Sequence, residues 1–186
     1  MTENMALQPE TTLASRVCHE GVFLTVRHDI VRLANGLERG RDVVEHPGGV
    51  MVVPRLDDGR LLLIRQYRYA LGDFLLEFPA GKIEPGEAPL QTIQRELEEE
   101  TGYAADHWQP LTKMATAPGF CNEWIHVFYA HGLRQLAEAG GLEDEAIELV
   151  PMHPEAIQAA IVEGRLTDAK TICGFALVAG MQGAIV

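Results

Sequence analysis

The chain has 186 residues, enough for one full domain or one domain with a small appendage, and 47% of them are hydrophobic, so a sizeable core can form. Its 15 Lys and Arg stand against 27 Asp and Glu, a formal charge of −12. That acidity argues against nucleic acid and anionic membrane as partners, because both attract a basic surface. A small anionic substrate would need something to offset the negative charge.

The first 47 residues are expected to form a tail and a β-hairpin. The opening sixteen residues lack the basic and apolar segments of a signal peptide and are interpreted as a mobile terminus. Apolar and polar residues alternate over Val22–Arg32, Asn35-Gly36 is a strong turn signal, and a second strand is predicted over Arg39–His46. Pro47-Gly48 ends this hairpin, which divides the chain into residues 1–47 and 48–186.

The second part carries alternating strand and helix signals. Apolar runs bounded by turn residues predict strands over 49–56, 60–68, 74–78, 111–116, 124–131 and 147–152, and Pro79-Ala80-Gly81 is expected to break the third. Helices are predicted over Ala88–Thr101, Pro154–Glu163 and Asp168–Gln182, and Gly102 caps the first. This order indicates an α+β domain with a mixed sheet and flanking helices.

The helix Ala88–Thr101 has an apolar face and an acidic one. Leu90, Ile93 and Leu97 share one face, which should pack on the sheet. Glu96, Glu99 and Glu100 follow the i, i+3, i+4 spacing, so their carboxylates cluster. Such a face is usually a solvated surface, but three close carboxylates also suit a hard divalent cation.

The residues around this helix follow a longer pattern. Gly81 is followed after five residues by Glu87, after seven more by Arg95-Glu96-Leu97, and then by Glu99-Glu100 and Gly102-Tyr103. Here the sequence resembles the Nudix hydrolase family, whose signature is G-x5-E-x7-R-E-U-x-E-E-x-G-U with U apolar. Every fixed position is met. The resemblance implies an α/β/α sandwich that hydrolyses a nucleoside diphosphate linked to another group.

The same resemblance assigns roles within the signature. It implies that Glu96, Glu100 and the carbonyl of Ala80 bind Mg²⁺, with Mn²⁺ as a substitute. Glu99 is then either a further metal ligand with a catalytic part or a carboxylate held by Arg95. The signature residues, here called the Nudix box, include four more that are expected to shape the loop and helix instead of touching substrate: Gly81, Glu87, Arg95 and Gly102.

Features outside the box resemble the ADP-ribose pyrophosphatase branch of that family. They are Arg65-Gln66-Tyr67-Arg68, Glu77–Gly81, and Pro118, sixteen residues past Gly102. The likeness implies hydrolysis of ADP-ribose to AMP and ribose 5-phosphate by a homodimer whose N-terminal sheets are exchanged. Two alternatives stay open: another nucleoside diphosphate sugar such as GDP-mannose or ADP-glucose, and a sensor that binds ADP-ribose without cleaving it.

Several residues are candidates for substrate contacts, and each also has a structural interpretation. Arginine side chains suit phosphate, although they can equally be solvated surface. Glu77 could hold a ribose hydroxyl or an exocyclic amine, or be a strand-end charge. Phe120 and Tyr67 could stack on a base, although core packing is the more usual role of aromatic residues. The full set of substrate candidates is Arg41, Arg65, Arg68, Glu77, Gly119 and Phe120.

A second acidic segment, Gly140–Glu145, precedes the last strand. In the resembling branch the catalytic base lies in this loop, which implies Glu143 as the base and Glu145 as a supporting carboxylate, in an order that the sequence leaves open. A loop can bring a base to the substrate on closure.

Neither a membrane span nor a disulfide framework is expected. No run of about 18 apolar residues is present. Cys18, Cys121 and Cys173 fit no disulfide or zinc spacing, and we interpret them as buried thiols of a cytoplasmic protein.

Overall fold

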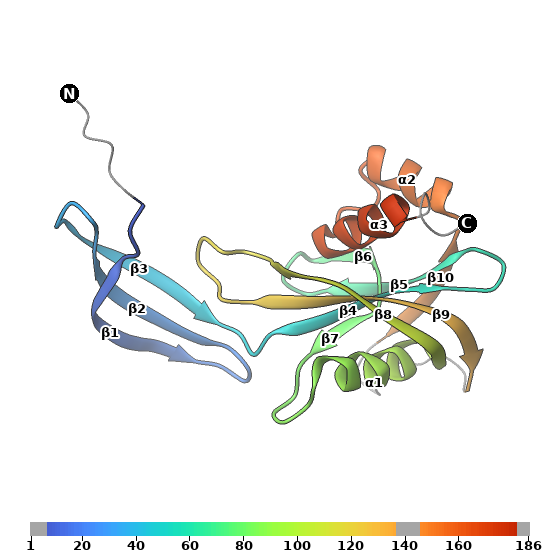
Figure 1. Cartoon of the computed structure of the whole chain (residues 1–186), viewed down its shortest axis with the longest axis horizontal. Coiled ribbons are helices and arrows are strands. Elements are labelled where there is room, and N and C mark those ends of the chain that lie inside the picture. The colour runs from blue at the N-terminus through green and yellow to red at the C-terminus, as the bar shows by residue number, and fades with distance from the viewer. Residues whose placement is uncertain (1–6, 137–145, 182–186) are drawn as a thin grey trace. The chain divides into compact units, whose positions relative to one another are not determined.

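The computed structural model describes residues 7–136 and 146–181, and the chain divides into two compact units. The N-terminal unit comprises residues 1–48 and 115–124, and the main unit comprises residues 49–114 and 125–186. The N-terminal unit carries a sheet of three antiparallel strands in the order β1-β2-β3 (Figure 1). Their bounds are β1 (Thr11–Glu20), β2 (Thr25–Arg32) and β3 (Glu38–Glu45).

The predicted hairpin is confirmed, but the strand that precedes it was missed. β2 and β3 pair from Thr25↔Glu45 to Arg32↔Glu38, and Gly36 takes a φ of 82° in the turn between them. The interpretation of the first sixteen residues as a mobile terminus is wrong from Thr11 on, because β1 pairs there with β2. Every residue of β1 is exposed, so burial imposes no alternation that the sequence could display.

The main unit contains one mixed sheet and three helices. In the described residues the sheet order is β10-β5-β4-β9-β8, with β6 paired to β5 and β7 paired to β4. The strands are β4 (Gly49–Arg55), β5 (Leu61–Arg68), β6 (Asp73–Glu77), β7 (Ala80–Lys82), β8 (Tyr103–Ala115), β9 (Trp124–Gln135) and β10 (Ile147–Met152). The helices are α1 (Pro89–Thr101), α2 (Pro154–Val162) and α3 (Ala169–Met181). β4 runs parallel to β9 and antiparallel to β5.

Strand β4 lies at the centre of two cores because both of its faces are covered. Met51 and Val53 belong to the cluster that α2 and α3 close, whereas Val50 and Val52 pack in a second cluster with Ile93 and Leu97 of α1, and this alternation is the period of a strand. Figure 1 shows α1 on one face of the sheet and α2 with α3 on the other. The predicted α/β/α sandwich with a mixed sheet is therefore confirmed.

Three local expectations are corrected by the structure. The break at Pro79-Ala80-Gly81 is confirmed, because β6 ends at Glu77, but a strand was missed there, since Ala80–Lys82 forms β7 and pairs with β4. β8 begins at Tyr103 instead of Leu111; its residues are mostly half-buried or exposed, which weakens the hydrophobic signal. Leu90 is 41% exposed in the first turn of α1, so the buried face of the helix begins only at Ile93.

Two further observations concern the cysteines and the helices. Cys18 and Cys173 are exposed and Cys121 is half-buried, so the interpretation of all three as buried thiols is wrong; all three are free. Among the helices of residues 7–136 and 146–181, none is long and apolar enough to cross a membrane.

Candidate active site

The acidic helix α1 has well-defined ends, which set the direction of its side chains. Pro89 occupies the first turn, where a missing N–H costs nothing, and the Gln91 side chain accepts a hydrogen bond from the N–H of Ala88 at 3.1 Å. Gly102 ends the helix with a φ of 73° and donates its N–H to the Glu98 carbonyl at 2.8 Å. The last two turns, which carry the glutamates, are thereby held against β7.

Arg95 binds three of the box carboxylates. Its Nε and Nη2 lie 3.1 and 3.2 Å from the two carboxylate oxygens of Glu87. Its Nη1 donates to Glu99 at 2.7 Å, and its Nη2 lies 3.0 Å from Glu96 Oε1. The hydrogen bond to Glu87 and the neighbouring carboxylates raise the pKa of Arg95 above its ordinary value. In turn, the hydrogen bond from Arg95 lowers the pKa of Glu87. One guanidinium thus offsets the repulsion within this acidic group.

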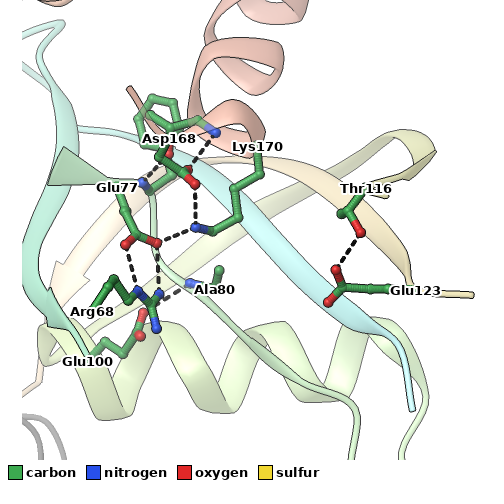
Figure 2. Close-up of polar contacts among 10 residues, drawn as sticks. Arg68, Glu77, Ala80, Glu100, Thr116, Glu123, Asp168 and Lys170 are labelled. Carbon is green, nitrogen blue, oxygen red and sulfur yellow. Dashed lines mark hydrogen bonds and ion pairs between the residues drawn. The ribbon is translucent and has the colours of Figure 1, made fainter. Parts of the chain in front are cut away.

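Gly81 and Ala80 bring β7 against the glutamates. A Cβ on Gly81 would lie 2.0 Å from Glu96 Cδ, so this position has room only for glycine while Glu96 keeps its place. The buried Glu100 accepts a hydrogen bond from the N–H of Ala80 at 3.0 Å (Figure 2). The box glycine and the box glutamates are therefore parts of one packed arrangement.

The chemistry of these donors fits a hard divalent cation. Glu96, Glu99, Glu100 and the Ala80 carbonyl offer only oxygen, the ligand atom that such ions prefer. Within residues 7–136 and 146–181, no three His, Cys, Asp or Glu side chains already form a metal-binding group. The carboxylates of Glu96 and Glu99 do not converge on a common point because both bind Arg95.

A second charged network lies where β5 and β6 meet α3. Arg68 donates to both carboxylate oxygens of Glu77, at 2.6 and 2.7 Å (Figure 2). Lys170 also binds Glu77 and lies 2.9 Å from Asp168. Burial alone would raise the pKa of Glu77, but the Arg68 hydrogen bonds and the charges of Lys170 and Arg68 outweigh it, and the pKa is lowered.

Sequence reasoning did not find Lys170 and Asp168. The available signal is Asp168 directly before a helix, as an N-terminal cap, and it accepts the N–H of Thr171 at 2.9 Å. Nothing in the sequence indicates that the first turn of α3 meets a glutamate of β6, because the two are far apart along the chain.

The remaining substrate candidates are distributed over both units. In the main unit, Arg65 lies 3.5 Å from Glu148 and 5.2 Å from the centre of the Phe74 ring. In the N-terminal unit, Arg41 binds both oxygens of Glu10 at 2.6 and 3.0 Å. A Cβ on Gly119 would meet nothing within 4 Å.

The two aromatic candidates are not core residues. Phe120 is 59% exposed and Tyr67 is 47% exposed, so the core-packing interpretation is wrong for both. The carbonyl of Phe120 accepts the N–H of Val44 at 2.7 Å, which joins segment 115–124 to β3.

The same segment contains a polar cluster that sequence reasoning did not define. Glu123 accepts a hydrogen bond from the Thr116 hydroxyl at 2.5 Å (Figure 2). Its carboxylate also lies 3.3 Å from His46 Nδ1. The candidate bases Glu143 and Glu145 lie outside the described residues.

The geometry of the box agrees with the comparisons with known families. Residues 45–172 match the model of the NUDIX domain. The chain belongs to the Nudix family. Residues 10–40 match the nucleoside diphosphate sugar hydrolase N-terminal domain. Together the two matches assign this Nudix protein to the hydrolases of nucleoside diphosphate sugars.

Individual relatives resemble the Nudix chain over most of its length. It is 38% identical to a methanol dehydrogenase activator of Bacillus methanolicus, over 88% of this chain and 89% of that protein. It is 39% identical to the ADP-ribose pyrophosphatase of Bacillus subtilis (strain 168), over 87% and 88%. A GDP-mannose pyrophosphatase of Yersinia enterocolitica serotype O:8 / biotype 1B is 37% identical over 67% and 69%. A crystal structure of an ADP compounds hydrolase superposes with a TM-score of 0.84 at 27% identity, over 97% and 98% of the two chains.

Proposed function

We propose that this Nudix enzyme hydrolyses the diphosphate of ADP-ribose to AMP and ribose 5-phosphate. The observation that carries the proposal is the 39% identity with the Bacillus subtilis ADP-ribose pyrophosphatase over 88% of that protein, with every fixed box position present. The packing of Glu96 and Glu100 against Gly81 and Ala80 of β7 supports it, because these carboxylates are not on a freely solvated helix face.

The cofactor in this proposal is Mg²⁺, with Mn²⁺ as a substitute, held by Glu96, Glu100 and the Ala80 carbonyl, with Glu99 beside them. When bound, the cation offsets the charge of the diphosphate and lowers the pKa of the attacking water. Glu96 lies 3.0 Å from Arg95 Nη2 and would exchange that contact for the ion, while Arg95 would keep Glu87 through two hydrogen bonds. Such a cation would offset the negative charge of a chain with a formal charge of −12 where an anionic substrate binds.

The chain's own side chains complete the reaction. Arg68 binds a phosphate oxygen, and Glu143, supported by Glu145, takes a proton from water as the new P–O bond forms and the bridging P–O bond breaks. The proton passes to the departing phosphate. Arg65, Arg41, Gly119 and Phe120 contribute further substrate contacts.

Quaternary structure is part of the same proposal. The N-terminal sheet is exchanged between two copies of the chain, so that each active site draws on both. β1 offers a ten-residue strand exposed at the edge of that sheet, a suitable element for pairing. The free cysteines suit the reducing cytoplasm. Sedimentation equilibrium should give twice the chain mass of 20.5 kDa, and a monomer would refute the exchange.

A second substrate has specific support. The Yersinia enterocolitica relative is named a GDP-mannose pyrophosphatase, although it covers a smaller part of the chain. We would measure kcat/KM for ADP-ribose, GDP-mannose and ADP-glucose with Mg²⁺ under the same conditions. The proposal is supported if kcat/KM is highest for ADP-ribose, and it is contradicted if kcat/KM is higher for GDP-mannose or ADP-glucose. Binding of ADP-ribose without release of AMP would indicate a sensor.

A further inference from the structure

We infer that Glu77 positions Arg68 for phosphate binding, and that Lys170 and Asp168 at the start of α3 hold Glu77 for that task. The inference rests on the proposed function, in which Arg68 contacts a phosphate. It replaces the expectation that Glu77 itself contacts a ribose hydroxyl or an amine.

The burial of Glu77 argues against direct substrate contact. Its side chain is 0% exposed, and both carboxylate oxygens already accept hydrogen bonds. Arg68 binds one oxygen through Nε and the other through Nη2, while Lys170 binds the second. Because this carboxylate is buried, a ligand could reach it only by displacing Arg68 or Lys170, and taking a cation from a buried carboxylate is costly.

Arg68 has the complementary exposure. Its side chain is 37% exposed although one edge of the guanidinium faces Glu77. A guanidinium carries five N–H donors in a rigid fork, and two of its nitrogens meet Glu77, so Nη1 retains donors that can reach a phosphate. A bidentate pair fixes the plane of the guanidinium and thereby the direction of those donors.

Lys170 adds positive charge beside Glu77, which offsets part of the negative charge that faces Arg68. Two cations lie near three carboxylates: Glu77 pairs with Arg68 and Lys170, Asp168 pairs with Lys170, and the charge of Glu100 also acts on Arg68. Glu77 pairs with Lys170 as well as with Arg68, so its single negative charge is divided between two cations and does not fully offset the charge of Arg68. Without Lys170, Arg68 and Glu77 would form a closed ion pair with less attraction for a phosphate.

The first turn of α3 also fixes the strand end that bears Glu77. The Thr171 hydroxyl accepts the N–H of Phe78 at 2.8 Å, and Asp168 accepts the N–H of Thr171 at 2.9 Å. Two residues on, Ala80 donates to Glu100. The segment from Glu77 to Ala80 therefore lies between α3 and α1, so one scaffold serves both the phosphate-binding arginine and the proposed metal site.

A double-mutant cycle between Arg68→Ala and Glu77→Gln tests this inference, with KM for ADP-ribose and kcat measured in the presence of Mg²⁺. Neither single variant leaves a buried carboxylate without a cation, because Lys170 remains beside Glu77. We expect Glu77→Gln to raise KM about tenfold with a smaller change in kcat, and to have no further effect on KM in Arg68→Ala. Lys170→Met should also raise KM, and Lys170→Arg should restore most of the loss.

The matched control is Glu163→Gln, since Glu163 binds Arg165 through the same two nitrogens but is 56% exposed. It should leave KM unchanged. The inference would be overturned if Glu77→Gln raised KM by the same factor in the wild type and in Arg68→Ala. It would also be overturned if KM were unchanged or lower in the Glu77→Gln single variant. Wild-type turnover is measured first. If there is none, the proposed function is contradicted but the inference is not. The double-mutant cycle is then evaluated from the Kd of ADP-ribose, measured by calorimetry, with Kd taking the place of KM in the outcomes above.

Discussion

Replacing Gly81 with alanine should misplace one carboxylate while leaving the fold intact. The new Cβ would lie 2.0 Å from Glu96 Cδ and 2.1 Å from its Oε1. Non-bonded carbons approach to about 3.5 Å, so the carboxylate must move by roughly 1.5 Å. Gly81 has no positive φ, so the backbone accepts alanine without strain.

The magnitude follows from that displacement. A misplacement of about 1 Å in an active site can cost about 100-fold in rate, so we expect kcat to fall by about 100-fold. The contact disturbed is the partly exposed pair of Glu96 with Arg95, and such pairs contribute about 0–1 kcal/mol to stability. The free energy of unfolding should therefore change by no more than about 1 kcal/mol.

The assay is AMP release from ADP-ribose, with urea unfolding measured in parallel. Gly180→Ala is the matched control, because its new Cβ meets nothing within 4 Å, and it should keep full activity. In a Glu96→Ala background, Gly81→Ala should cause no further loss, since the side chain that it displaces is gone. Full activity of Gly81→Ala, or an equal further loss without the Glu96 side chain, would refute the reasoning.

Three further predictions concern charge and packing. Arg95→Lys keeps the charge but loses the fork that binds three carboxylates, so kcat should fall about tenfold or more in the same assay, and wild-type kcat would contradict this. Because the pKa of Glu77 is lowered from 4.5, its ionised form stabilises the fold above about pH 4.5, and this stability is lost as the pH falls through the lower native pKa. Urea unfolding at stepwise lower pH should therefore show a shallower acid decline for Glu77→Gln, and an unchanged slope would count against the pairing. Gly174→Ala would bring a Cβ to 2.5 Å from Met51 Cε, so we expect about 1–3 kcal/mol of destabilisation in urea, and wild-type stability would contradict the close approach of α3 to β4.

Sequence periodicity located most elements because burial imposes it. β4 and β5 are covered by side chains and helices, so they read as apolar runs, and α1 shows its buried face through Ile93 and Leu97. β1 escaped detection because all its residues are exposed and only backbone pairing defines it. The three-residue strand β7 was missed for a related reason, because only its backbone pairing with β4 defines it as a strand.

The candidate site was predictable where its members are close in the sequence. Helical spacing alone brings Glu96, Glu99 and Glu100 together, and Arg95 reaches Glu99 one turn away. The network of Glu77 with Lys170 was not predictable, since it depends on how α3 packs against the sheet. The exposure of Phe120 was not predictable either, because an aromatic side chain serves a core or a surface equally well.

The central claim is that the box glutamates act as one site for a cation-dependent hydrolysis of ADP-ribose. Its most direct test compares initial rates of AMP release for the wild type and Glu100→Gln, each with Mg²⁺ and with excess EDTA. We predict rapid release only for the wild type with Mg²⁺, and a loss of about 100-fold or more in Glu100→Gln with its circular dichroism spectrum unchanged. Full activity of Glu100→Gln, or of the wild type in EDTA, would contradict the claim.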